Sequence, residues 1–246
     1  MGQLFHTVLY LPLLNILVFF YNVVPGHDIG VAIIILTILM RLLVWPLAKK
    51  SIVAQKQMSG LQPKLNALKE QYKNDKQGLA AATMQLYKDE KMNPLSSCVP
   101  LLIQLPLLIV FYWVLQDVLH SKNLNELYPF VTNPESIKVL AFGFLDLLKP
   151  NYVLAILAGA AQFWQAKMLP MARPMVKTEG SKDEDMTAMM NRQMMYMMPV
   201  MTVVIGFSLP GGLSLYWLIT TLMTVFQQKI ILRGSSIVSV TPSSSS

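Results

Sequence analysis

The sequence predicts an all-α polytopic membrane protein with a five-transmembrane-helix core, and three observations lead to this fold class. The chain is 54% hydrophobic and only 13% charged, with a mean hydropathy of +0.46, whereas soluble domains carry about 25% charged residues. Its apolar residues gather in runs that approach the ~20 residues a helix needs to cross a bilayer. Its lysines gather in loops beside those runs, where they set the orientation and contact anionic lipid. The net charge of +7 therefore does not require a direct nucleic-acid partner.

The predicted elements follow the apolar runs and the loops between them. In order, they are an N-terminal interfacial helix over 1–25, a first transmembrane helix over 28–48, a basic cytoplasmic helical hairpin over 49–93, a second transmembrane helix over 95–118, an exterior loop over 119–150, a third transmembrane helix over 151–169, a cytoplasmic loop over 170–192, a fourth transmembrane helix over 193–209, a fifth over 213–229, and a disordered cytoplasmic tail over 230–246. Basic loops face the cytoplasm, so both lysine-rich loops and the C-terminus are placed inside.

The first apolar run, residues 4–24, has two interpretations. Its length and its few polar residues favour a helix that crosses the membrane, with the N-terminus inside. A helix lying along the outer interface would leave the N-terminus outside. The family resemblance given below favours this second placement, and it is the one we expect.

The basic segment after the first transmembrane helix has the pattern of two packed helices. Between Lys49 and Lys91 it carries nine lysines against four acidic residues. Apolar residues recur there at the three- and four-residue spacing of one helix face, namely Met58, Leu61, Leu65, Leu68 and Tyr72, and after an interruption at 74–78 also Leu79, Ala82 and Leu86. This pattern predicts an antiparallel helical hairpin with lysine-rich outer faces.

Arg41 is the most informative single residue, because it lies inside the apolar run 29–47. Lys49 and Lys50 mark the cytoplasmic end of that run, so Arg41 lies about two turns within the membrane. A guanidinium at the centre of a helix costs at least ~2.5–3.5 kcal/mol on insertion scales unless it snorkels, pairs or faces water. Snorkelling to the interface and a functional, water-facing position are both open, and the polar residues of the other helices favour the second.

Polar side chains occur at similar depth in several transmembrane helices. Those that would line a shared groove with Arg41 are Thr37, Gln104, Gln162, Tyr216 and Trp217. Buried polar side chains need partners or water, so their convergence would create a hydrated groove in the inner half of the bilayer. The arginine has no acidic partner at this depth in the sequence, which predicts a site for an external anion such as an acidic peptide.

No catalytic motif was found, and the sequence predicts neither an enzyme nor a bound metal or cofactor. It lacks a His-Glu-x-x-His zinc motif, a nucleophile elbow and a phosphate-binding glycine loop. Methionines are unusually dense, with eight of the 17 between residues 186 and 201. They suit adaptable apolar contacts. An alternative function is therefore a small polytopic transporter or metal permease that uses these thioethers as ligands.

Several long motifs resemble those of the YidC/Oxa/Alb membrane protein insertases, specifically the bacterial YidC branch in its short form, without the large periplasmic domain. The resemblance covers about residues 28–232. In order, the motifs are 41–47 (RLLVWPL), 58–64 (MSGLQPK), 87–95 (YKDEKMNPL), 98–106 (CVPLLIQLP), 209–217 (LPGGLSLYW) and 227–228 (QQ).

The resemblance implies a five-helix core whose groove opens to the cytoplasm and to lipid. It implies that Arg41 attracts acidic residues of a client's translocating segment, and that Thr37, Gln162 and Trp217 line the groove and contact the client. The basic hairpin would be the mobile element needed for insertion. The implied partners are nascent membrane protein clients with acidic extracellular tails and membrane lipid, and further the Sec translocon, components of the signal recognition pathway and the ribosome. The implied location is the bacterial inner membrane, with a cytoplasmic C-terminus.

Overall fold

The computed structural model describes residues 3–73, 75–93, 99–168 and 195–234, and this part of the chain is mostly helical. Its elements are α1 Gln3–Phe5, the π-helix η1 His6–Tyr10, α2 Leu11–Val23, α3 Ile29–Leu43, α4 Trp45–Gly60, α5 Gln62–Gln71, α6 Lys76–Asp89, α7 Val99–Leu119, the short 3-10 helix η3 Leu124–Glu126, strands β1 Leu140–Ala141 and β2 Leu145–Asp146, α8 Tyr152–Met168, a helix over Met195–Gly206, and α10 Gly211–Gly234. The two short strands pair antiparallel.

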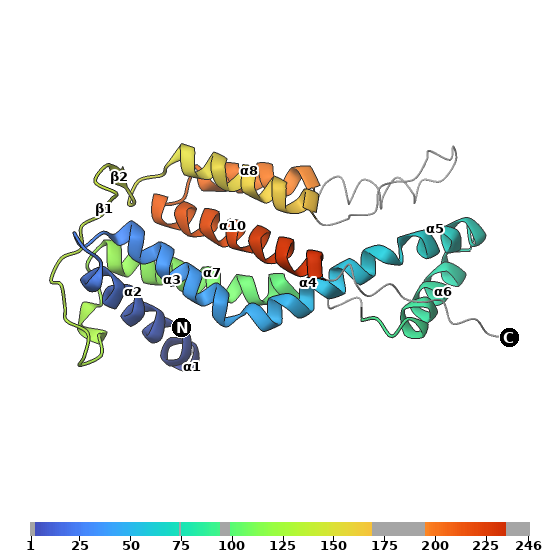
Figure 1. The fold of residues 1–246 in the computed structure, drawn as a ribbon, viewed down its shortest axis with the longest axis horizontal. Coiled ribbons are helices and arrows are strands. Elements are labelled where there is room, and N and C mark those ends of the chain that lie inside the picture. Colours follow the sequence, from blue (N-terminus) through green and yellow to red (C-terminus); the bar gives the residue numbers. More distant parts are fainter. Residues whose placement is uncertain (1–2, 74, 94–98, 169–194, 235–246) are drawn as a thin grey trace.

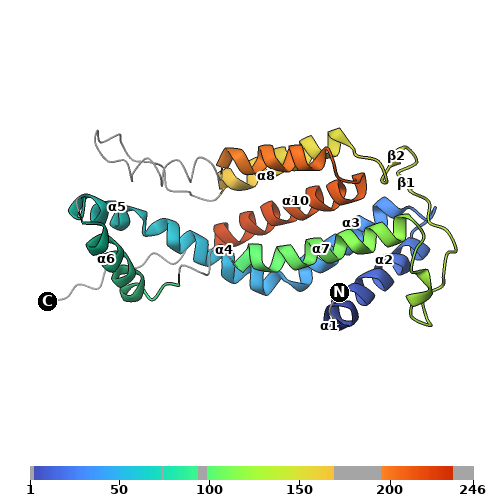
Figure 2. The same ribbon diagram turned by 180° about the vertical axis from the view of Figure 1, so that it is seen from behind.

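The apolar helices lie side by side in an elongated bundle (Figure 1). Helix α10 packs against α8 and α3, and the view from behind shows α7 beside α3 on the same side of α10 (Figure 2). Two described helices, Gln3–Val23 and Gly211–Arg233, are long and apolar enough to cross a membrane, and the bent pair α3 and α4 would make a third. The described residues thus form an all-α membrane protein.

Local signals in the sequence explain where several helices begin. The Asp28 carboxylate accepts hydrogen bonds from the amides of Gly30 and Val31 at 2.8 and 3.1 Å, which caps the exposed N–H groups of α3. Asp75 caps α6 in the same way through the amide of Gly78 at 2.8 Å. Pro46 lies in the first turn of α4, where its missing N–H costs no helical hydrogen bond.

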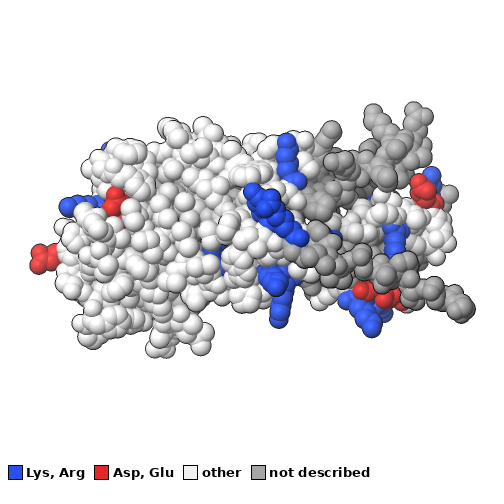
Figure 3. Space-filling view, viewed as in Figure 1, with Lys and Arg blue, Asp and Glu red and all other residues white. Residues whose placement is uncertain are grey.

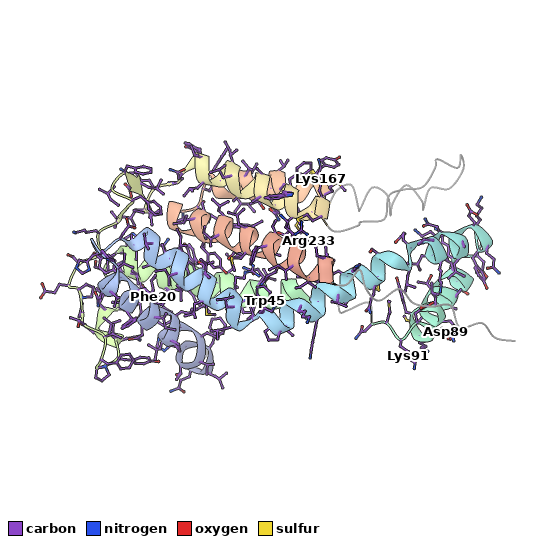
Figure 4. All side chains as sticks on the ribbon, viewed as in Figure 1. Phe20, Trp45, Asp89, Lys91, Lys167 and Arg233 are labelled. Carbon is purple, nitrogen blue, oxygen red and sulfur yellow. The ribbon has the colours of Figure 1, made fainter. Side chains whose placement is uncertain are left out.

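The basic pair α5 and α6 projects from one end of the bundle, and the loop with β1 and β2 lies at the opposite end (Figure 1). Lys167 of α8 and Arg233 of α10 both lie near the end from which α4 leaves (Figure 4). On the face drawn in Figure 3, charged side chains lie at the end that carries β1 and β2 and again from the middle of the molecule to the end that carries α5 and α6, and the broad band between them is nearly uncharged. Such a band is what the hydrocarbon core of a bilayer requires.

The N-terminal helical segment Gln3–Val23 packs along the end of the bundle that carries β1 and β2. The Tyr10 hydroxyl donates to Asp117 at 2.5 Å, the Asn15 side chain accepts from the amide of Tyr128 at 2.5 Å, and Asn22 donates to the carbonyl of Thr132 at 2.7 Å. These partners belong to the last turn of α7 and to the loop that follows it. The N-terminal segment is therefore fixed to the end of α7 and to the loop after it by hydrogen bonds at Tyr10, Asn15 and Asn22.

Three helix boundaries differ from the sequence-based expectation. The first transmembrane helix was expected over 28–48, but α3 ends at Leu43 and α4 continues at an angle of 65°. The first arm of the hairpin is split between Gly60 and Gln62, because Pro63 begins a new helix. Helix α10 continues to Gly234, beyond the expected end at 229. The expected loop over 170–192 and most of the methionine-rich segment lie outside the described residues.

Candidate functional site

Arg41 lies in the last turn of α3, at the point where the bundle meets α4. Its Nη2 donates to Oε1 of Gln104 on α7 at 2.9 Å, and Nε2 of Gln104 donates to the Tyr216 hydroxyl of α10 at 3.0 Å. Tyr216 is 5% exposed, and its ring stacks on Phe111 with a centroid distance of 4.0 Å. A chain of hydrogen bonds thus joins α3, α7 and α10 through three of the predicted site residues.

The guanidinium of Arg41 is only partly buried, and it stays charged at any physiological pH. Among the described residues no carboxylate lies within ion-pair distance of it. Its side-chain partner is a neutral glutamine oxygen, so no carboxylate in the described part of the chain compensates the positive charge. Buried or half-buried charges are usually paired, so this arrangement can attract an anion that the described part of the chain does not supply.

Thr37 lies one turn before Arg41 but does not take part in the hydrogen-bond chain. Its hydroxyl donates to the carbonyl of Ile33 at 2.7 Å, and the residue is 1% exposed. Trp217 is half-buried and follows Tyr216 by one residue, so it points about 100° further around α10. Neither side chain has a described hydrogen bond to Arg41.

Gln162 lies on α8 and belongs to a separate pair. Its Oε1 accepts a hydrogen bond from the hydroxyl of Thr202, on the helix Met195–Gly206. Sequence reasoning did not single out Thr202, because a threonine in an apolar helix is ordinary. Hydrogen bonds therefore connect three of the predicted site residues, Arg41, Gln104 and Tyr216. Gln162 is bound to Thr202 instead, and Thr37 and Trp217 belong to neither group.

Polar atoms continue along α10 beyond Tyr216. Ser214, Gln227 and Gln228 are each at most 2% exposed, yet one side-chain oxygen of each has no partner among the described residues. The Gln227 amide donates to the backbone carbonyl of Arg41 at 3.2 Å. Buried polar atoms without protein partners are usual where a site admits water. Buried polar side chains therefore occur near both ends of α10, among apolar residues.

Comparison with known proteins identifies the family. The profile of the family described as "60Kd inner membrane protein" matches residues 19–237. The chain is 38% identical over 223 residues to the membrane protein insertase YidC of Shewanella halifaxensis, covering 91% of this chain and 36% of the relative. It is 36% identical over 206 residues to the membrane protein insertase YidC of Fusobacterium nucleatum, covering 84% of this chain and 87% of the relative.

The two relatives differ in length. This chain spans about a third of the Shewanella protein but most of the Fusobacterium protein. The family description places these proteins in an inner membrane, which agrees with the several apolar helices of the bundle. The chain therefore belongs to the 60Kd inner membrane protein family, the family of the YidC membrane protein insertases.

Proposed function

We propose that the protein moves apolar segments of client proteins from the cytoplasm into the bilayer, and that Arg41 receives the acidic tail that such a segment must translocate. The observation that carries this proposal is the guanidinium of Arg41, which Gln104 holds within an apolar bundle and which has no carboxylate partner among the described residues. The names of the relatives support the insertase function. The driving force is the transfer of the client's apolar surface into lipid, with no nucleotide needed.

The proposed core consists of five helices, α3, α7, α8, Met195–Gly206 and α10, with the groove between them open to the cytoplasm. The buried oxygens of Ser214 and Gln227 support a hydrated interior, because water would satisfy them. The C-terminus is proposed to be cytoplasmic, since Lys167 and Arg233 lie at the end that carries the basic hairpin (Figure 4). Thr37, Gln162 and Trp217 remain candidate client contacts.

The N-terminal segment is proposed to lie in the outer interface rather than to cross the membrane. Its 21 residues could span a bilayer by length. Among the described aromatic contacts between this segment and α7, the one furthest from the end of α7 at Leu119 joins Phe5 to Trp113, with ring centroids 5.9 Å apart. Trp113 precedes the end of α7 at Leu119 by only about 9 Å of helix. A crossing helix would reach much further along α7, so the contacts favour the interfacial placement.

The methionine-based permease is the less favoured alternative. Met197, Met198 and Met201 are 56%, 48% and 62% exposed, so they face away from the bundle rather than toward a shared site. Outward methionines suit contact with lipid or with an apolar client.

Insertion of a single-span client into proteoliposomes tests the proposal. The client carries one acidic residue in its N-terminal tail, and a second client carries a neutral residue there. The attraction between the Arg41 guanidinium and a client carboxylate about 4 Å away is worth up to about 4 kcal/mol at an effective dielectric constant near 20. Arg41→Ala should therefore lower insertion of the acidic client by about tenfold or more. Arg41→Lys should retain most of it. Equal insertion by all three proteins would show that Arg41 is only an interfacial anchor.

A further inference from the structure

The break between α3 and α4 leaves a backbone carbonyl without its usual donor. Helix α3 ends at Leu43, and Val44 has φ −86° and ψ 5°, outside the helical region. Pro46 has no N–H, so the carbonyl of Leu42, four residues earlier, has no helical donor. The helical donor of the Arg41 carbonyl would be the amide of Trp45, and the turn at Val44 interrupts the series there. The Val44 amide still reaches the carbonyl of Met40 at 3.1 Å. In the described part of the chain no backbone amide reaches the carbonyl of Arg41, which is the next acceptor in the helical series.

Gln227 of α10 supplies the missing donor. Its Nε2 lies 3.2 Å from the Arg41 carbonyl oxygen, and the residue is completely buried at 0% exposure. A buried carbonyl without a partner is destabilising, so a side-chain amide at this place has a clear physical role. An apolar side chain of the same size would fill the space but leave the carbonyl unsatisfied.

Helix α10 consequently holds Arg41 at both ends. The backbone is bound by Gln227, and the guanidinium is bound through Gln104 to Tyr216. Tyr216 and Gln227 are separated by about three helical turns, so they lie on the same face of α10. Two contacts on one rigid helix fix both the position of the α3 end and the direction in which the arginine side chain leaves it.

We propose that Gln227 is a positioning residue for Arg41: it holds the interrupted end of α3 so that the guanidinium faces the client's acidic tail. The inference rests on the proposed function, because it takes Arg41 to be the receiver of that tail. It assigns a role to Gln227, a residue that the insertion mechanism itself does not use.

Gln228 provides a matched control. It is the same residue type, lies next in the same helix and is 2% exposed. One residue along a helix is a rotation of about 100°, and Gln228 has no described hydrogen bond to Arg41. A substitution there removes an equally buried amide that makes no described hydrogen bond to Arg41.

The test measures the ratio of insertion of the acidic-tailed client to that of the neutral-tailed client in proteoliposomes. Gln227→Leu should lower this ratio about fivefold, the factor that loss of one hydrogen bond worth about 1 kcal/mol produces. Gln228→Leu should leave the ratio unchanged. In an Arg41→Ala background, Gln227→Leu should lower the ratio no further. Gln227→Met, which is more flexible, serves if the leucine variant is not recovered as a folded protein by size exclusion.

Each outcome decides between the possibilities. In one outcome, Gln227→Leu lowers insertion of both clients equally, so that their ratio keeps its wild-type value, while Arg41→Ala removes the preference for the acidic client. Gln227 is then merely structural and the inference is wrong. A further fall of the ratio in the Arg41→Ala background also overturns it. If the wild-type protein itself shows no preference for the acidic client, the proposed function fails, and the positioning role fails with it.

Discussion

Removal of the Gln104 side-chain amide should destabilise the bundle more than removal of the hydroxyl of its neutral partner, Tyr216. Gln104→Leu eliminates the hydrogen bond from Arg41 at 2.9 Å and the one to Tyr216 at 3.0 Å. A hydrogen bond to a charged group contributes about 1.5–3 kcal/mol and a neutral one about 1 kcal/mol. The expected loss in the free energy of unfolding is therefore about 3 kcal/mol. Tyr216→Phe removes only the neutral bond and should cost about 1 kcal/mol.

The double variant Gln104→Leu with Tyr216→Phe is the decisive measurement. The bond between the two residues is lost in either single variant, so the double variant should cost about 1 kcal/mol less than the sum. The free energy of unfolding is measured in mixed micelles titrated with a denaturing detergent. Tyr112→Phe is the control, since Tyr112 lies on the same helix as Gln104 but is 37% exposed. Costs that add within about 0.5 kcal/mol would refute the hydrogen-bond chain.

Two further predictions concern the end of the bundle that carries β1 and β2. Gly30→Ala would place a Cβ 2.5 Å from the Cβ of Ala141, which should lower the free energy of unfolding by about 1–3 kcal/mol. In the control Gly60→Ala the new Cβ meets nothing within 4 Å, so the free energy of unfolding should stay the same or rise. Equal effects of the two substitutions would contradict the close packing at Gly30. Burial raises the pKa of Asp146, but the hydrogen bond from Lys149 and the neighbouring amides outweigh it and lower the pKa overall. The stabilisation that this carboxylate gives its loop should therefore be complete above its ordinary pKa of about 3.9 and lost as the pH falls through the lowered value. Carboxyl-carbon NMR should show that midpoint rising in Lys149→Ala; an unmoved midpoint would exclude the lysine as a cause.

The sequence was sufficient for the fold class and the family. Apolar runs and lysine-rich loops reflect the cost of placing polar groups in hydrocarbon, and that cost applies to each segment separately. The motifs around Arg41, Gln104 and Tyr216 carry the family resemblance without any knowledge of contacts, and the family match covers residues 19–237.

The sequence was less informative about helix ends. A continuous apolar run over 29–47 gives no sign that the helix stops at Leu43, although Pro46 in the run was visible. A proline can begin a new helix or kink an existing one, and the choice depends on which neighbours satisfy the freed carbonyls. Here the carbonyl of Arg41, which has no helical donor at the break, is bound by Gln227, 186 positions further along the chain.

By itself, the sequence therefore determined which segments are apolar, that one arginine lies among them, and to which family the chain belongs, because these are properties of single segments. Only the tertiary structure decided which polar residues meet. It joins Arg41 to Gln104 and Tyr216, and it pairs Gln162 with Thr202 instead. The physical reason is that hydrogen bonds act over about 3 Å, and the helices that bring donors within this distance are arranged by packing across the whole bundle.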